Sequence, residues 1–122
     1  MRRLGRAGLL CVSLKEGDME QIAFLMRLKP GYEAEYRKRH DEIWPELSAA
    51  LTAAGICDYS IFLDEETLNL FAVLRLRPDN TREVLPTLPI MRRWWDYMAD
   101  LMLVDEANKP LERALTRVFH MD

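Results

Sequence analysis

An α+β fold with a four-stranded antiparallel sheet is predicted by three features of this 122-residue chain. The length fits a single domain. Three segments have the composition and alternation of strands, and two regions between them have helical spacing. The end of the chain suits a fourth strand, so the predicted order is strand, helix, strand, strand, helix, strand.

The first strand is predicted over residues 21–28, because its apolar side chains alternate with those of the opposite face. The alternating residues are Ile22, Phe24, Met26 and Leu28. Pro30 and Gly31 follow and end the strand.

A helix is predicted over residues 32–43, with a break at Trp44 that Pro45 imposes on the residue before it. Pro45 is also well suited to open a second helix, which extends over residues 45–54. Gly55 supplies the left-handed residue that closes this helix.

Residues 56–63 and 68–77 are rich in aromatic and branched side chains and predict the second and third strands. The acidic linker at residues 64–67 has the length of a hairpin loop, so the two strands are expected to be antiparallel.

The second helical region is divided by Pro86 and Pro89 into a short piece and a longer one over residues 89–103. The longer piece is expected to place four large apolar residues on one side: Met91, Trp95, Met98 and Met102. Residues 111–121 suit either a helix or a strand, and we favour a strand that ends the chain at the sheet.

This order is the split βαβ arrangement of ferredoxin-like folds, with helices on only one face of the sheet. The other face needs cover, and packing against a second copy would supply it. The sequence therefore predicts a homodimer in which two sheets form an α/β barrel.

Residues 1–18 are expected to be a basic and mobile extension, with the domain proper over residues 19–122. The apolar run after Arg6 is too short to cross a membrane and lacks a signal-peptide cleavage site. Cys11 and Cys57 have no metal-ligand spacing and are expected to be free thiols, so a cytoplasmic protein without membrane contact is predicted.

Several function classes are excluded by composition and motifs. A net charge of -3 argues against nucleic-acid binding, which requires clustered Lys and Arg. The chain has no phosphate-binding glycine loop, no nucleophile elbow and no zinc-binding motif. The expected chemistry needs no metal and no organic cofactor.

Five residues are candidates for a site, although each also suits a structural role. Tyr36 and His40 lie one helical turn apart, where a phenol and an imidazole can meet one ligand. Tyr59 shares its strand face with other inward residues. Trp94 and Trp95 project in different directions, so one can pack in the core while the other meets a sugar. Core packing remains the simpler explanation for the aromatic residues.

The segments 36–47 (YRKRHDEIWPEL) and 93–98 (RWWDYM) closely resemble the L-rhamnose mutarotase family, and the resemblance extends from Met19 almost to the C-terminus. It implies a dimeric α/β barrel that interconverts the α and β anomers of L-rhamnose without a cofactor. It also implies that His40 is the proton donor and that the sugar is contacted by Tyr36, Tyr59, Trp94 and Trp95. His120 has no consistent counterpart in the family and is given no role.

The expected mechanism opens the sugar ring by protonating its ring oxygen while the anomeric hydroxyl loses a proton. Water, Tyr59 or a carboxylate could accept that second proton. Two other classes remain compatible with the fold: a monooxygenase or haem-handling enzyme with the same barrel, and a non-catalytic module that binds a small ligand.

Overall fold

The computed structural model describes residues 19–122, so the predicted extension at residues 1–18 lies outside the described residues. The elements in chain order are β1 (Glu20–Arg27), α2 (Glu33–Asp41), α3 (Pro45–Ala53), β2 (Ile56–Asp64), β3 (Asn69–Leu76), the 3-10 helix η2 (Arg82–Thr87), α4 (Pro89–Met98) and β4 (Arg113–Leu115).

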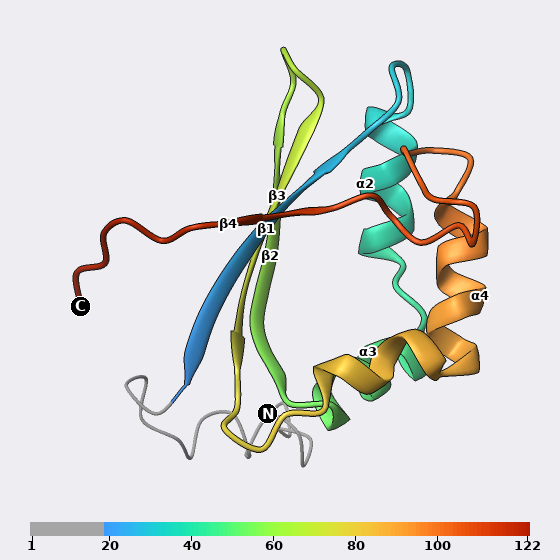
Figure 1. The fold of residues 1–122 in the computed structure, drawn as a ribbon. Helices are drawn as coiled ribbons and strands as arrows, with labels where there is room; N and C mark the ends of the chain where they lie inside the picture. The colour runs from blue at the N-terminus through green and yellow to red at the C-terminus, as the bar shows by residue number, and fades with distance from the viewer. Residues whose placement is uncertain (1–18) are drawn as a thin grey trace, which may run out of the picture.

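The four strands form one antiparallel sheet in the order β2-β3-β1-β4 (Figure 1). This is the ferredoxin-like arrangement, and it confirms the predicted βαββαβ topology. The hairpin between β2 and β3 is also confirmed, because Asp64 at the end of β2 pairs with Asn69 at the start of β3.

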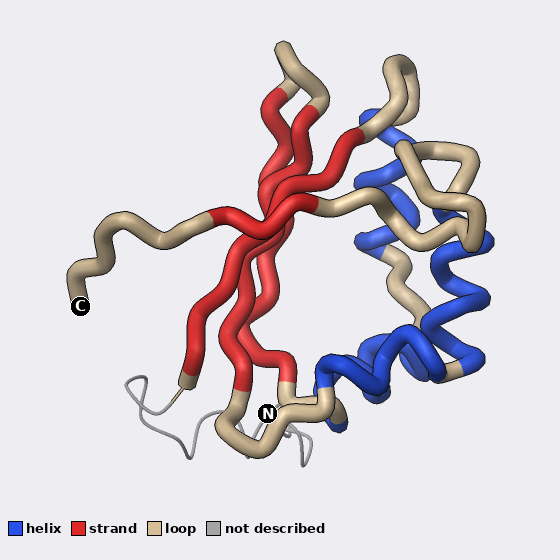
Figure 2. The backbone as a smooth tube through the Cα atoms, in the orientation of Figure 1, coloured by secondary structure: helices blue, strands red, loops and turns tan. Residues whose placement is uncertain are grey.

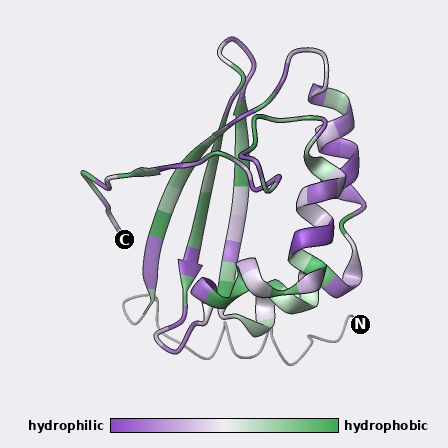
Figure 3. Cartoon of the chain, turned by 45° about the vertical axis from the view of Figure 1, so that its right-hand side comes forward, coloured by the Kyte–Doolittle hydropathy of each residue, from purple (hydrophilic) through white to green (hydrophobic). Residues whose placement is uncertain are grey.

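All the helices lie on one side of the sheet (Figure 2). The inner face of the sheet, which the helices cover, carries the buried strand residues Phe24, Met26, Leu70, Ala72, Leu74 and Leu76. Hydrophobic bands run along the strands, whereas α2 is largely hydrophilic (Figure 3). Because α2 has so few apolar residues, its packing on the sheet depends mainly on Tyr36, its one buried side chain.

The break between α2 and α3 occurs where the sequence predicts it. Trp44 has extended dihedral angles, φ -61° and ψ 129°, and Pro45 occupies the first turn of α3. Gly55 follows the helix with φ +91°, a left-handed conformation that favours glycine.

Helix α4 ends at Met98, so the prediction that it continues to Leu103 is wrong. The reason is backbone pairing with the end of β1. The Lys29 N–H donates to the Leu101 carbonyl over 2.8 Å, and the Leu103 N–H donates to the Arg27 carbonyl over 3.0 Å. Met102 is buried in this extended segment and does not share a helix face with Met98.

The final strand is present but much shorter than the predicted range 111–121. Only Arg113–Leu115 pairs with β1, opposite Ala23–Leu25. Residues 116–122 are exposed and extend away from the sheet and helices (Figure 1). The apolar pattern that predicted a long strand therefore continues into a segment without a partner strand in this chain.

Cys57 corrects a further expectation: it is disulfide-bonded, so it does not carry a free thiol. Cys11 lies outside the described residues. Among residues 19–122, no helix has both the length and the apolar character needed to cross a membrane.

Gly55 and Gly31 provide a matched test of the turn that ends α3. A Cβ at Gly55 would lie 2.9 Å from the Asn80 Cα, whereas a Cβ at Gly31, with φ +89°, would meet no atom within 4 Å. Replacement of Gly31 by Ala should cost about 1–2 kcal/mol from backbone strain alone. Gly55→Ala should cost more, because Asn80 must also move. Urea unfolding of both variants measures the difference, and equal losses would contradict this account.

Candidate active site

Tyr36 and His40 form the centre of the candidate site. Their ring centroids are 4.3 Å apart, as their spacing of one turn in α2 predicts. His40 Nδ1 lies 3.0 Å from the Tyr36 carbonyl oxygen. A carbonyl oxygen only accepts, so Nδ1 carries the hydrogen in this contact. Neutral His40 therefore has its lone pair on Nε2, and the protonated imidazole donates from Nε2.

Trp94 contacts the imidazole edge to face, with ring centroids 5.4 Å apart and an interplanar angle of 88°. Trp44, at the break before α3, contacts the same indole at 5.0 Å and 85°. Because Trp94 is buried, its ring gives α2 and α4 a fixed contact. His40 thus lies in contact with an aromatic ring from its own helix and one from α4.

Arg39 connects α2 to the C-terminal end of α4. Its guanidinium donates to Glu35 over 2.8 Å, to Asp100 over 3.2 Å and to the Tyr97 carbonyl oxygen, and it lies 4.2 Å from the centroid of the Tyr97 ring. The side chain is only 13% exposed, which makes these contacts stronger than those of a solvated ion pair. They hold the residue next to His40 in place.

Tyr59 reaches the site from β2. A bulge in this strand places Asp58 and Tyr59 opposite Leu74, and Asp58 has φ 49° and pairs with Arg75 over 3.4 Å. Tyr59 is 39% exposed, but its hydroxyl is crowded by protein, which raises the pKa of this phenol to about 12. Tyr59 also contributes to the raised pKa of the Tyr36 phenol.

The five predicted residues thus fall into connected groups. Tyr36, His40 and Trp94 are in ring contact, and Tyr59 is related to them through its effect on the pKa of Tyr36. Trp95 is half-buried and follows Trp94 in α4, with the Lys109 ammonium 5.8 Å from its ring centroid.

Three charged residues near Tyr59 and Trp95 were not predicted from the sequence: Arg82, Lys109 and Glu112. We call these three residues the charged wall. The Glu112 carboxylate lies 3.7 Å from an Arg82 nitrogen and 3.8 Å from the Lys109 ammonium. Both Glu112 and Arg82 interact electrostatically with the Tyr59 phenol. Lys109 and Glu112 lie three residues apart in one loop, whereas Arg82 lies in η2, and no spacing pattern in the sequence relates Arg82 to the other two.

Burial is also the main cause of the pKa shifts of His40 and Tyr36. Desolvation lowers the pKa of His40 below its usual 6.5, although the Tyr36 carbonyl and Asp41 oppose this effect. Burial raises the pKa of Tyr36 far above its usual value, and the nearby Tyr59 adds to the shift. At pH 7 the imidazole is therefore mainly neutral and both phenols keep their protons.

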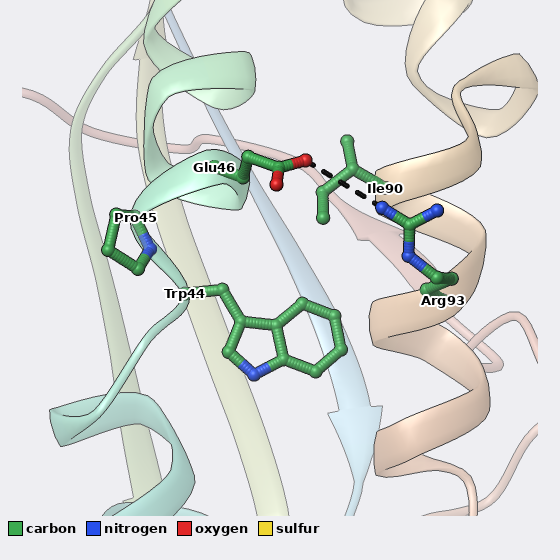
Figure 4. Close-up of a pocket in the computed structure, with 5 residues that line it drawn as sticks. All are labelled: Trp44, Pro45, Glu46, Ile90 and Arg93. Atoms are coloured by element: carbon green, nitrogen blue, oxygen red, sulfur yellow. Dashed lines mark ion pairs between the residues drawn. The ribbon is translucent and has the colours of Figure 1, made fainter.

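A separate surface hollow of about 420 Å³ is lined by Trp44, Pro45, Glu46, Ile90 and Arg93 (Figure 4). Glu46 and Arg93 form an ion pair of 3.7 Å across it. None of the five predicted site residues lines this hollow, and it contains no histidine. Within residues 19–122, no three His, Cys, Asp or Glu side chains are grouped to hold a metal ion.

Comparison with known proteins identifies similar chains. A family model described as L-rhamnose mutarotase matches residues 21–121. An L-rhamnose mutarotase of Burkholderia orbicola is 57% identical over 104 residues, which are 85% of this chain and 100% of the relative. One of Flavobacterium johnsoniae is 52% identical over 100 residues, 82% of this chain and 94% of the relative.

A solved structure is similar as well. The crystal structure of an L-rhamnose mutarotase from Formosa agariphila matches with a TM-score of 0.78 and 43% sequence identity. The match covers 84% of this chain and 99% of the other chain. The similarity therefore includes both the fold and the region of the candidate site.

The lowered pKa of His40 predicts how stability depends on pH. The unfolded chain binds a proton at His40 near pH 6.5, whereas the folded chain binds it only at lower pH. The contribution of His40 is therefore complete above pH 6.5 and is lost as the pH falls below this value. The free energy of unfolding should fall more between pH 7.5 and 5.5 in the wild type than in His40→Asn. The same pH dependence in both proteins would refute this expectation.

Proposed function

Because the chain belongs to the L-rhamnose mutarotase family, we infer that it interconverts the α and β anomers of L-rhamnose. It is an isomerase that acts on a carbohydrate. The match of the family model to residues 21–121 carries this conclusion, and the contact of His40 with Tyr36 and Trp94 gives it a chemical basis.

We propose that His40 is the proton donor. Protonated His40 gives its Nε2 proton to the ring oxygen, the bond from that oxygen to C1 breaks, and the anomeric hydroxyl loses its proton to form the open-chain aldehyde. After rotation about the C1–C2 bond, the same transfers run in reverse and close the ring on the other face. The hydrogen bond from Nδ1 to the Tyr36 carbonyl supports this role, because it orients the ring and leaves Nε2 for the substrate. Proton transfer alone is sufficient for ring opening and closure, so the proposed reaction needs no cofactor.

The lowered pKa of His40 affects this step in two ways. It reduces the fraction of protonated imidazole at pH 7, and it makes the protonated form a stronger acid. The donor is therefore scarce but effective, and the neutral form is ready to accept the proton when the ring closes.

We propose that Tyr36, Tyr59, Trp94 and Trp95 contact the sugar. Their rings provide the apolar surface that the methyl group of L-rhamnose needs, and their polar atoms provide hydrogen-bond partners. Tyr59 and Trp95 are the more accessible pair, while Tyr36 and Trp94 are buried and limit the site from within. The raised pKa of Tyr59 keeps it a neutral phenol at pH 7, so water or a carboxylate is the better acceptor for the anomeric proton.

We also propose that residues 19–122 form the enzyme domain, that residues 1–18 are an extension, and that the enzyme acts in the cytoplasm. The family model supports the first boundary, since it begins at residue 21. The disulfide at Cys57 is unusual for a cytoplasmic protein, so fractionation of cells is the direct measurement of location.

A homodimer is the proposed assembly, with a second copy on the outer face of the sheet, opposite the helices. Pairing places an apolar group on this face: Leu25, Phe62, Phe71, Val73 and Leu115. Phe62 is 64% exposed within the single chain. The apolar C-terminal residues beyond β4 also lack a partner strand here, and a second sheet could cover both surfaces.

Replacement of His40 by Ala should lower the catalysed exchange rate by about 10²- to 10⁴-fold, the usual contribution of a general acid. Saturation-transfer NMR between the anomers of L-rhamnose measures this rate. His120→Ala is the control, because His120 is exposed near the C-terminus and pairs with Asp122, so it should leave the rate unchanged. A wild-type chain that gives no exchange above the uncatalysed rate would rule out the proposed function.

Phe62→Lys should convert the dimer to a monomer, because it places a charge within the proposed apolar contact. Sedimentation at micromolar concentrations measures the change. Val84→Lys alters another exposed apolar residue, which lies in η2 and not on the outer face of the sheet, and should remain dimeric. A wild-type chain that sediments as a monomer would contradict the proposed assembly.

A further inference from the structure

The charged wall is built from two parts of the chain that the fold brings together. Arg82 begins η2, Lys109 lies in the loop before β4, and Glu112 immediately precedes β4. The same Glu112 oxygen, Oε1, faces both cations, at 3.7 Å from Arg82 Nη2 and 3.8 Å from Lys109 Nζ. Two positive charges therefore fix the direction of one carboxylate.

The charged wall lies at the side of the site formed by Tyr59 and Trp95. Lys109 lies over the Trp95 ring, and the Arg82 guanidinium is 5.5 Å from the centroid of Phe24, a residue of the inner sheet face. Arg82 and Glu112 are the charged groups whose fields act on the Tyr59 phenol. The contact of Lys109 with Trp95 thus places one end of the charged wall beside α4, the helix that also carries Trp94.

The Glu112 carboxylate is too far from Arg82 and Lys109 to form hydrogen bonds with them. An N–H···O hydrogen bond spans about 2.7–3.2 Å, so separations of 3.7 and 3.8 Å are attractive without being hydrogen bonds. The side chains of Glu112 and Arg82 are 32% and 37% exposed, which keeps them accessible to a ligand. An ionised carboxylate only accepts hydrogen bonds, and sugar hydroxyls are suitable donors.

We propose that Glu112 accepts hydrogen bonds from two neighbouring hydroxyl groups of the sugar, while Arg82 and Lys109 hold its carboxylate in position. This inference rests on the proposed function and deepens it, because it assigns the polar side of the site. The aromatic residues recognise the ring and its methyl group, whereas Glu112 recognises the position of the hydroxyls. Selectivity among deoxy sugars then depends on a charge as well as on shape.

The test compares Glu112→Gln with wild type in saturation-transfer NMR on L-rhamnose. Gln has the same size but no charge, so KM should rise by about 10-fold, the loss expected for charge-assisted hydrogen bonds, while kcat stays within about twofold. Glu106→Gln removes an exposed carboxylate from the same loop and should not change either constant. An unchanged KM in Glu112→Gln would overturn the proposal. So would a fall in kcat at constant KM, since that result makes Glu112 a proton acceptor.

Deoxy derivatives of L-rhamnose locate the contact. The three derivatives each lack one hydroxyl, at C2, C3 or C4. For the two derivatives that lack a hydroxyl bound by Glu112, which are at neighbouring carbons, Glu112→Gln should raise KM less than it does for L-rhamnose itself. An equal effect on all three derivatives would also overturn the proposal.

Direct binding separates this proposal from the proposed function. If the wild-type chain binds L-rhamnose in an NMR titration but does not accelerate anomer exchange, the proposed function fails. About 10-fold weaker binding by Glu112→Gln would still support the role of Glu112, whereas equal binding would refute it. A wild-type chain that binds no sugar overturns both.

Discussion

Tyr36 is buried between α2 and the sheet, and much of the rest of the site depends on this packing. It is the single buried side chain of a helix that is otherwise hydrophilic, so it fixes how α2 lies on the sheet. Its carbonyl oxygen sets the tautomer of His40, and its ring supports the imidazole. One residue therefore links the hydrophobic core to the proposed proton donor.

The site is held together by aromatic contacts and by ion pairs and hydrogen bonds. Aromatic contacts from Tyr36, Trp94 and Trp44 form its interior, where they exclude water from one side of His40. Ion pairs and hydrogen bonds of Arg39 join α2 to the end of α4 nearer the surface. Because salt screens ion pairs but hardly affects dispersion contacts, the inner part of the site should be less sensitive to ionic strength than the contacts of Arg39.

Local patterns were sufficient to predict the element order, the break at Trp44 and the hairpin, since each depends on residues close in sequence. The pairing of Tyr36 with His40 followed from helical spacing for the same reason. The early end of α4 and the short β4 could not be predicted, because both depend on which backbone groups of β1 are available as partners. The charged wall was missed because Arg82 and Glu112 approach each other only after the sheet and η2 have formed. The alternation that places Tyr59 on the same strand face as Ile61 is local and was predicted, but its interaction with these charges was not.

The bulge in β2 reverses the phase of side-chain alternation along that strand. Before it, the even-numbered Ile56 pairs with Leu76 of the inner face; after it, the odd-numbered Ile61 pairs with Ala72 of the same face. Asp58 is thus one supernumerary residue, and a β2 strand without it would still direct Tyr59 and Ile61 inward. Loss of one residue at the bulge would leave the side chains of both flanking parts on their present faces, whereas loss of one within a paired part of β2 would turn every side chain beyond it to the other face.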